Sequence, residues 1–200
     1  MNAIIPLMAS DEIGHMAAHS LLKPAPGQRI SATVVSSLDE RQMVTAIRAA
    51  VFLGEEGGLY SQHFDENDID AAFVLVRFGS EPVGTVRIRY FADFIRLDKL
   101  AVLKAYRVFP VLNALITAAF RYARAKGYGT VTGIARPGTE KFWKRRKCRE
   151  TGVPVLTKYG PLLPMSGPIP DYPDIEPIRL DDCGAEDFEI RLFGWEGNRI

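Results

Sequence analysis

The sequence predicts one α/β (α+β) domain, built on a mixed, mainly antiparallel sheet of six or seven strands with a bulged central strand and helices on both faces. Three observations support this fold class. Short β-branched or alternating segments recur between residues 30 and 135 and are separated by helical patterns. Two of the strands are joined by a short Gly-Ser-Glu-Pro turn, which is typical of an antiparallel hairpin. One further strand changes the parity of its apolar residues partway along, which is typical of a β-bulge.

Composition and charge limit the class of protein. The 200 residues carry 25 Lys+Arg and 24 Asp+Glu, so a net charge of +1 points to no polyanionic partner. The two cysteines are too few for a disulfide framework. The N-terminal apolar segment has no basic residues before it and is interrupted by Pro6, which argues against a signal peptide. No apolar run approaches the roughly 20 residues of a membrane span. We therefore expect a cytoplasmic protein, a monomer or a homodimer, without a membrane span.

The chain divides into two predicted regions. Residues 1–29 form an N-terminal leader with a short helix near residues 11–22. Residues 30–200 form the domain itself. They include a Pro-rich segment at 160–178, which the prolines predict to be a structured meander or loop, and a closing strand at 188–192.

The first half of the domain predicts a strand, a helix, a connection and a hairpin. Residues 30–35 are rich in β-branched side chains and read as a strand. Residues 38–52 place Met, Ile, Ala and Val on one helical stripe. Residues 54–70 are rich in Gly and acidic side chains and form a long polar connection. The apolar run 71–78 and the alternating strand 83–90 pair as the antiparallel hairpin.

Residues 94–103 form the bulged strand. Ile95 and Leu97 keep one alternation, whereas Leu100 and Val102 keep the opposite one. A bulge bends a strand and redirects its side chains. The remaining elements are an amphipathic helix at 110–125, a strand at 129–135 and a short basic helix at 139–147.

This order of elements and three motifs resemble the GNAT (Gcn5-related N-acetyltransferase) superfamily over about residues 30–195. The motifs are Ile-Arg-Ala-Ala-Val-Phe at 47–52, Glu-Pro-Val-Gly-Thr-Val-Arg-Ile-Arg at 81–89, and Leu-Asp-Lys-Leu-Ala-Val-Leu-Lys-Ala-Tyr-Arg at 97–107, the last followed by the helix and by Lys-Gly-Tyr-Gly at 126–129. The resemblance implies an acyltransferase that moves an acyl group from an acyl thioester (acyl-CoA) to the amino group of a small molecule by direct attack. No metal is implied.

The resemblance also implies where the acyl donor binds. The bulged strand diverges from its neighbour and receives the pantetheine arm, and the next loop and helix N-terminus hold the pyrophosphate. The implied donor-binding residues are Leu100, Ala101, Val102, Arg107, Val111, Leu112 and Asn113. The family pattern Arg-x-x-Gly-x-Gly/Ala starts at Arg107 but has Pro110 and Leu112 at its small positions. Pro110 lacks an N–H and Leu112 adds bulk, so we expect free coenzyme A to bind weakly.

A weaker similarity links the chain to the acyl-homoserine-lactone synthases and N-acyl amino acid synthases. It is carried by residues 48–52, by the acidic residues after them and by residues 83–88. These GNAT-fold enzymes often take acyl groups from acyl carrier protein, which presents acyl-phosphopantetheine without a pyrophosphate. A tryptophan of the lactone synthases is missing here. The predicted landing site for an acidic carrier protein is formed by Lys144, Arg145 and Arg146.

Acyl transfer to an amine needs a base for the ammonium proton and donors that polarise the thioester carbonyl. Asp98 is the predicted base, because it occupies the family's acidic position before the Leu-Ala-Val of the bulged strand. The alternative for Asp98 is an ion pair with Arg96 or Arg89. The backbone N–H of Ala101 or Val102 is the predicted oxyanion donor.

The acceptor side is predicted from charged residues around the polar connection: Arg48, Asp65, Asp68, Asp70 and Arg89. Carboxylates hold an ammonium and an arginine holds a carboxylate. A polar surface loop explains the same acids. Residues 65–70 lack the ligand spacing and turn glycine of a calcium loop, and His15 and His19 lack a third metal ligand.

Two other classes of function stay open. Where the family has a tyrosine acid, this chain has Phe142 and Trp143, and an indole cannot protonate a thiolate. Together with Pro110 and Leu112, this departure also fits a GNAT-like binding or regulatory domain without catalysis. The six cations and two aromatics of residues 141–149 suggest nucleic acid, a solvated helix face or coenzyme phosphates; nucleic acid is the least expected because the whole chain is nearly neutral.

Overall fold

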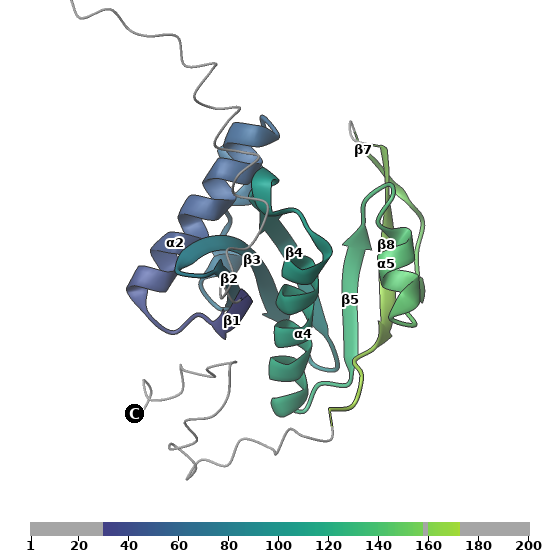
Figure 1. Ribbon diagram of the computed structural model, residues 1–200. Helices are drawn as coiled ribbons and strands as arrows, with labels where there is room; N and C mark the ends of the chain where they lie inside the picture. The colour runs from purple at the N-terminus through teal and green to yellow at the C-terminus, as the bar shows by residue number, and fades with distance from the viewer. Residues whose placement is uncertain (1–29, 158–159, 173–200) are drawn as a thin grey trace, which may run out of the picture.

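The computed structural model describes residues 30–157 and 160–172 of the chain (Figure 1). The predicted leader helix near residues 11–22 and the predicted closing strand at 188–192 lie outside these residues. None of the helices in the described part is long and apolar enough to cross a membrane.

The core of the fold is a mixed sheet of eight strands in the order β1-β2-β3-β4-β5-β8-β6, with β7 paired to β8. The β4–β5 pair is parallel, and the other pairs are antiparallel. The predicted mixed, mainly antiparallel sheet is therefore confirmed, with eight strands instead of six or seven. The strands are β1 (Ile30–Val34), β2 (Ala72–Phe78), β3 (Glu81–Tyr90), β4 (Ile95–Val102), β5 (Thr130–Ala135), β6 (Arg149–Glu150), β7 (Val155–Thr157) and β8 (Gly160–Pro168).

The helices include two short 3₁₀ turns and one π-helix. They are α2 (Leu38–Arg48), the π-helix η1 (Ala49–Glu55), α3 (Tyr60–His63), the 3₁₀ turns η2 (Glu66–Asp68) and η3 (Lys104–Tyr106), α4 (Phe109–Ala125) and α5 (Glu140–Arg145).

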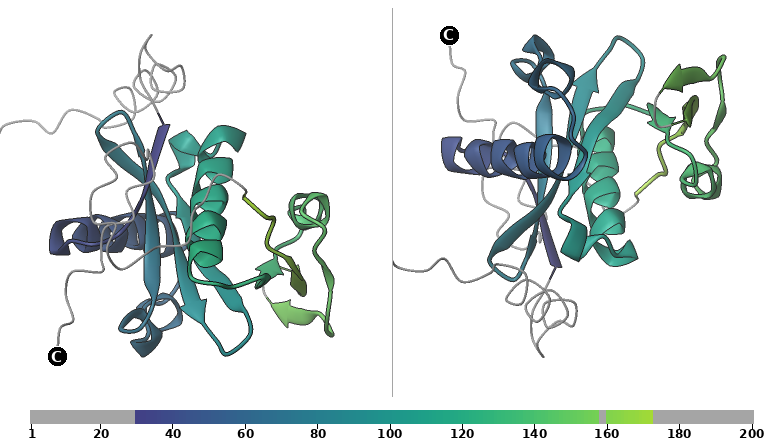
Figure 2. Two further views of the ribbon diagram at one scale, coloured as in Figure 1. Left: turned by 90° about the horizontal axis from the view of Figure 1, so that it is seen from below. Right: turned by 90° about the horizontal axis from the view of Figure 1, so that it is seen from above.

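Helices cover both faces of the sheet, as predicted (Figure 2). On the face beneath α4, a large apolar cluster joins Val86, Ile88, Leu97 and Val102 to the buried side of α4. On the opposite face, a second cluster joins α2 and η1 to Phe73, Leu75 and Ala101. The predicted hairpin is confirmed: β2 and β3 pair across a turn in which Gly79 has φ +62°, a conformation that favours glycine.

The predicted start of the helix over 38–52 is confirmed, but the helix changes from an α-helix to a π-helix before the predicted end. Ser37 caps α2, since its side chain accepts a hydrogen bond from the Glu40 N–H at 3.1 Å. From Ala49 to Glu55 the helix is a π-helix, whose wider turn shifts the inward-facing positions. Phe52 is therefore buried, whereas Ala50, expected on the apolar stripe, is exposed.

The Pro-rich segment is partly a strand, and the prediction of a meander or loop over its first part was wrong. Residues 160–168 form β8, between β5 and the short β6. The C=O of Pro164 accepts a hydrogen bond from the Thr151 N–H at 3.0 Å. Because the N and O of one strand residue point to the same side, the ring nitrogen of Pro164 faces away from β5. The missing N–H therefore costs no hydrogen bond with β5.

Candidate active site

The predicted bulge lies in β4, opposite the middle of β3. Thr85 pairs with Ala101 and Arg87 pairs with Asp98, so one extra residue of β4 is accommodated between these pairs. Lys99 lies in this bulge with φ +48°, in the left-handed region. The bulge changes the facing of the strand: Leu97 and Val102 pack in the cluster beneath α4, whereas Ala101 packs beneath α2.

Strands β4 and β5 pair only near their starts. The paired residues are Ile95 with Val131 and Arg96 with Thr132. Within the described residues, no strand pairs with the later part of β4 on the side that faces β5, and the two strands diverge toward their ends (Figure 1). The Leu103 N–H donates to the Val83 C=O at 3.0 Å, toward β3. Because backbone groups alternate along a strand, the N–H and C=O of Val102 point to the open edge.

The loop after β4 is tied to the end of the π-helix. The Nε of Arg107 donates to the Val102 C=O at 2.9 Å, and its Nη2 pairs with Glu55. The other carboxylate oxygen of Glu55 accepts the N–H of Lys104 at 3.1 Å. The Arg107 side chain, which the family resemblance placed at the donor phosphates, is thus held by Glu55 in this structure.

Helix α4 begins one residue earlier than predicted, at Phe109, with Pro110 in its first turn. The Leu112 N–H donates to the Val108 C=O at 3.3 Å, and the Leu112 side chain packs against the core. The side chain of Val111 is fully buried. The N–H groups of Phe109 and Val111 lie in the first turn, where a helix has no acceptors of its own for them, and they remain the candidates for an anion.

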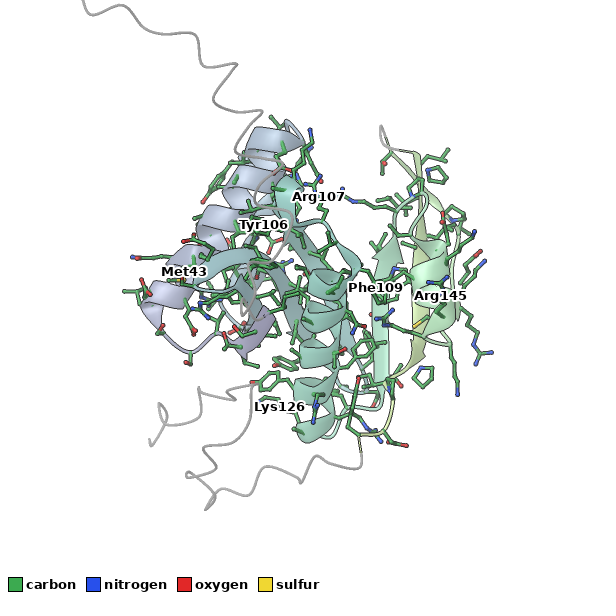
Figure 3. All side chains as sticks on the ribbon, viewed as in Figure 1. Met43, Tyr106, Arg107, Phe109, Lys126 and Arg145 are labelled. Atoms are coloured by element: carbon green, nitrogen blue, oxygen red, sulfur yellow. The ribbon has the colours of Figure 1, made fainter. Side chains whose placement is uncertain are left out.

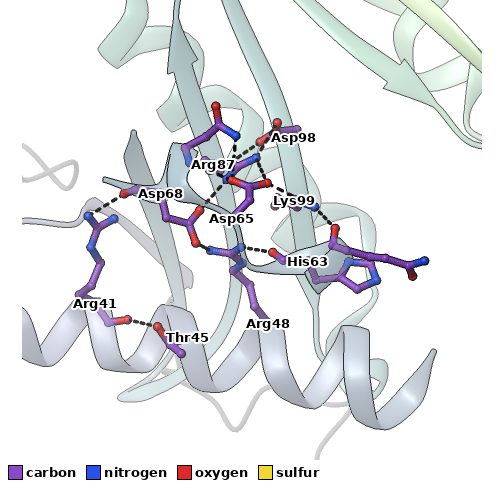
Figure 4. Close-up of polar contacts among 11 residues, drawn as sticks. Arg41, Thr45, Arg48, His63, Asp65, Asp68, Arg87, Asp98 and Lys99 are labelled. Carbon is purple, nitrogen blue, oxygen red and sulfur yellow. Dashed lines mark hydrogen bonds and ion pairs between the residues drawn. The ribbon is translucent and has the colours of Figure 1, made fainter. Parts of the chain in front are cut away.

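A buried arginine joins three of the predicted acids. Arg87 is 1% exposed, and its guanidinium donates to Asp65 at 2.6 Å, to Asp68 at 2.6 Å, and to both oxygens of Asp98 at 2.6 and 3.0 Å (Figure 4). Burial lowers the pKa of Arg87, but the three carboxylates outweigh burial and the net pKa is raised. The hydrogen bonds from Arg87 are the main reason that the pKa of Asp65 is well below its usual range.

A second buried arginine extends this cluster. Arg48 is 2% exposed; it donates to Asp68 Oδ2 at 2.8 Å and to the backbone C=O of His63, and lies over the ring of Phe64. The structure therefore brings together Arg48 with the carboxylates that surround Arg87. Of the other two predicted acceptor-side residues, Arg89 donates to Asn67, which itself donates to Asp65, and Asp70 is exposed.

Sequence reasoning did not single out Arg87 as a site residue. The partner of Asp98 is Arg87, neither Arg96 nor Arg89. The alternation of side chains along the strand could have indicated it, because Arg87 falls on a sheet face that a helix was predicted to cover.

Sequence reasoning also missed His63 and Lys99. The His63 ring stacks on Phe52, with ring centroids 4.4 Å apart. A Cβ on Gly58 would lie 2.4 Å from His63 Nε2, so a larger residue than glycine would displace the ring. Lys99, in the bulge of β4, donates to the backbone C=O of Gln62 and has a pKa lowered chiefly by burial.

One ion pair connects the residue that follows the π-helix to the residue that follows β5. Arg136 follows β5 directly, and its two Nη atoms donate to the two carboxylate oxygens of Glu56 at 2.9 and 3.2 Å. This two-point contact joins the elements on either side of the divergence between β4 and β5.

The three cations predicted to meet a carrier protein differ in their surroundings. Lys144 pairs with Glu150 at 3.3 Å. Arg146 stacks over Phe142 and donates at 2.9 Å to Asn113, one of the predicted donor-binding residues. Arg145 is exposed, on α5 at the edge of the molecule away from α2 (Figure 3).

Two further residues of this region are structural. Trp143 is buried, and a Cβ on Gly133 would lie 2.2 Å from its ring. Cys148 is also buried, and burial raises the pKa of its thiol.

Among residues 30–157 and 160–172, no group of three His, Cys, Asp or Glu side chains is placed to hold a metal ion.

Comparisons with known proteins agree with this architecture. A family model described as "Acetyltransferase (GNAT) family" matches residues 41–146. The curated Bacillus subtilis (strain 168) protein "Putative acetyltransferase BSU40680" is 34% identical over 93 residues, which is 44% of this chain and 63% of that protein. The match thus spans less than two thirds of the relative's length.

Solved structures share the fold. A "putative N-acetyltransferase from Lactobacillus plantarum" aligns with a TM-score of 0.65 and 24% identity, over 70% of this chain and 98% of that chain. FeeM, an N-acyl amino acid synthase from uncultured soil microbes, aligns with a TM-score of 0.59 and 13% identity, over 72% and 93%. BjaI, a CoA-dependent acyl-homoserine lactone synthase, aligns with a TM-score of 0.59 and 14% identity, over 71% and 84%. Since the family model covers more than half of the sequence, the chain belongs to the GNAT acetyltransferase family.

Proposed function

We propose that this chain transfers an acyl group from an acyl thioester to the amino group of a small molecule, with the donor's pantetheine arm along the open edge of β4. The observation that carries the proposal is the end of β4–β5 pairing after Arg96. Unpaired N–H and C=O groups on a strand edge bind an extended chain that has amide groups of its own, as pantetheine has.

The open edge also supplies the group that stabilises the reacting carbonyl. The acceptor's neutral amine attacks the thioester carbon, the C–N bond forms, and the C–S bond breaks as the thiolate leaves and takes up a proton. The alternation fixed by the Leu103–Val83 hydrogen bond favours the N–H of Val102, rather than that of Ala101, as the oxyanion donor. The neighbouring C=O of Val102 is already bound by Arg107.

The acids predicted to hold the acceptor support the site rather than line it openly. Arg87 engages Asp65, Asp68 and Asp98 at once, and Arg48 adds a second cation. In this proposal the cluster anchors the connection between η1 and β2 against the bulge of β4. The predicted role of Asp98 as the base stays a prediction. Both carboxylate oxygens of Asp98 already accept N–H groups from Arg87, at 2.6 and 3.0 Å, so this side chain is held against Arg87.

Two donor classes fit the loop differently. Pro110 lacks an N–H and the Leu112 N–H is directed at Val108, so fewer amides remain for a pyrophosphate than in the family pattern. These features favour acyl-phosphopantetheine on a carrier protein as a second candidate donor beside acyl-CoA. An acyl thioester of either kind fits the predicted cytoplasmic location.

Thermal shifts with coenzyme A, a long-chain acyl-CoA and acyl carrier protein test the proposal. A donor present at about 100 times its Kd should add about 2.7 kcal/mol to the free energy of unfolding. No shift with any of the three donors would contradict it and favour a binding domain that has lost catalysis.

A further inference from the structure

We propose that His63 is the base that takes the proton from the acceptor amine. The inference rests on the function proposed above and adds to it a catalytic residue from the connection between η1 and β2. Three sets of contacts carry it: those that fix the imidazole ring, those that place it beside the diverging strands, and the charges around it.

The His63 ring is held firmly without using its nitrogens. It stacks on Phe52 at an interplanar angle of 13°, and Gly58 leaves room for its Nε2 edge. The backbone is fixed as well, because the His63 C=O accepts from Arg48 and the Gly58 N–H donates to the Phe52 C=O at 2.8 Å. Within the described part of the chain, neither ring nitrogen makes a hydrogen bond. A general base requires an imidazole of fixed orientation with a ring nitrogen that is free to accept a proton.

Two contacts link the His63 ring to the strand that carries the predicted oxyanion donors. Phe52, on which it stacks, packs in one apolar cluster with Ala101, the residue next to Val102. The residue before His63 is bound through its C=O by Lys99, which lies in the bulge of β4. His63 is therefore fastened to the part of β4 at which the strand edge opens.

Four charged groups act on the imidazole, from four elements around it. Burial is the largest cause of the lowered pKa of His63, followed by the cation of Lys99 on β4. Arg136, after β5, and Arg48, on α2, lower the pKa further, whereas Glu56, after η1, raises it. A lowered pKa favours the neutral imidazole, which is the form that can accept a proton.

The step balances as follows. His63 removes one proton from the acceptor's ammonium group and becomes an imidazolium, and the neutral amine attacks the thioester carbon. The C–N bond forms, the C–S bond breaks, and the nitrogen loses a second proton. The leaving thiolate takes up one proton and the other is released to solvent, so that His63 returns to its neutral form.

The test compares His63→Gln and His63→Phe with wild type and with Ser61→Ala, a matched control at an exposed position of the same helix. His63→Phe keeps an aromatic ring on Phe52 but has no proton acceptor. Thiol release from acetyl-CoA and decanoyl-CoA is measured with a panel of amino acids and primary amines. We expect kcat to fall about 10²–10⁴-fold in both His63 variants, with donor affinity unchanged. Full activity of a folded His63→Phe variant would overturn the proposal.

A second readout does not need an acceptor. The pKa of His63, followed by NMR of its ring protons, should lie below the ordinary histidine value, should rise in Lys99→Met, and should stay low in Lys99→Arg. If the enzyme turns over, the acidic limb of the pH profile of kcat should shift together with the pKa of His63 in these variants. Binding of acetyl-CoA should also shift the ring signals. If wild type binds no donor and releases no thiol, the proposed function fails; if it binds the donor but the His63 signals do not respond, only the assignment of His63 fails.

Discussion

Replacement of Arg87 by methionine should destabilise the domain more than any surface charge change. Arg87 is 1% exposed and donates five hydrogen bonds to three carboxylates. Arg87→Met removes the cation, keeps a long apolar side chain, and leaves Asp65, Asp68 and Asp98 close together without it. Their mutual repulsion and loss of hydrogen bonds should loosen the connection between η1 and β2.

The magnitude follows from burial. Removal of one partner from a buried ion cluster costs roughly 3–5 kcal/mol, because the remaining charge is uncompensated. The side chains of the three aspartates are 19–31% exposed, so water relieves part of this cost. We therefore expect a loss of about 3 kcal/mol in the free energy of unfolding, measured by urea denaturation followed by circular dichroism.

The effect should also depend on pH. The folded-state pKa of Asp65 is held below its unfolded value by Arg87, so the stabilisation from this pair is complete above the unfolded pKa and is lost as the pH falls through the folded one. The difference between wild type and Arg87→Met should shrink below about pH 4. Lys144→Met, which breaks an exposed pair with Glu150, is the matched control and should cost about 1 kcal/mol or less. A loss below about 1 kcal/mol for Arg87→Met would refute the reasoning.

Three further predictions concern the site and its supports. Asp98→Asn should keep turnover within about 10-fold of wild type while lowering stability, and a loss of about 10²–10⁴-fold in kcat without a change in stability would restore Asp98 as the base. Gly133→Ala should lower the free energy of unfolding by about 1–3 kcal/mol, because the new Cβ overlaps the Trp143 ring; unchanged urea denaturation would contradict this. Charge reversal at Lys144 and Arg145 should reduce activity with acyl carrier protein but not with acyl-CoA, and less so as salt rises. An equal loss with both donors would place α5 on coenzyme phosphates, and no loss with either would leave it as a solvated face.

The sequence patterns predicted strands β1 to β5, the hairpin, both long helices and the bulge. Alternation and helical periodicity report directly which side chains are buried, and the parity change between Leu97 and Leu100 located the bulge within a residue or two. The π-helix could not be predicted, because α2 and η1 form one continuous apolar pattern. Strand β8 was missed because prolines argue against a strand, and only the pairing direction shows that the Pro164 nitrogen faces away from β5.

The candidate site was predicted in its parts but not in its connections. Asp98 was predicted as the base on the bulged strand, and Arg48, Asp65 and Asp68 were predicted as acceptor-side residues around the polar connection. Their common partner, Arg87, could not be predicted from local sequence, because the tertiary fold brings it to Asp65, which lies 22 residues earlier in the chain. His63 is likewise positioned by ring stacking and by the bulge, and neither contact leaves a pattern in the local sequence.

The central claim is that the donor binds along the open edge of β4. Backbone amide NMR of the ¹⁵N-labelled chain, titrated with coenzyme A and with a non-hydrolysable acyl-CoA thioether, tests it most directly. We predict that the Val102 amide shows a large shift and slower hydrogen exchange, while the amides of Ile95 and Arg96, beside the β4–β5 pairing, change little. Donor binding that perturbs residues of α5 and leaves Val102 unchanged would contradict the account.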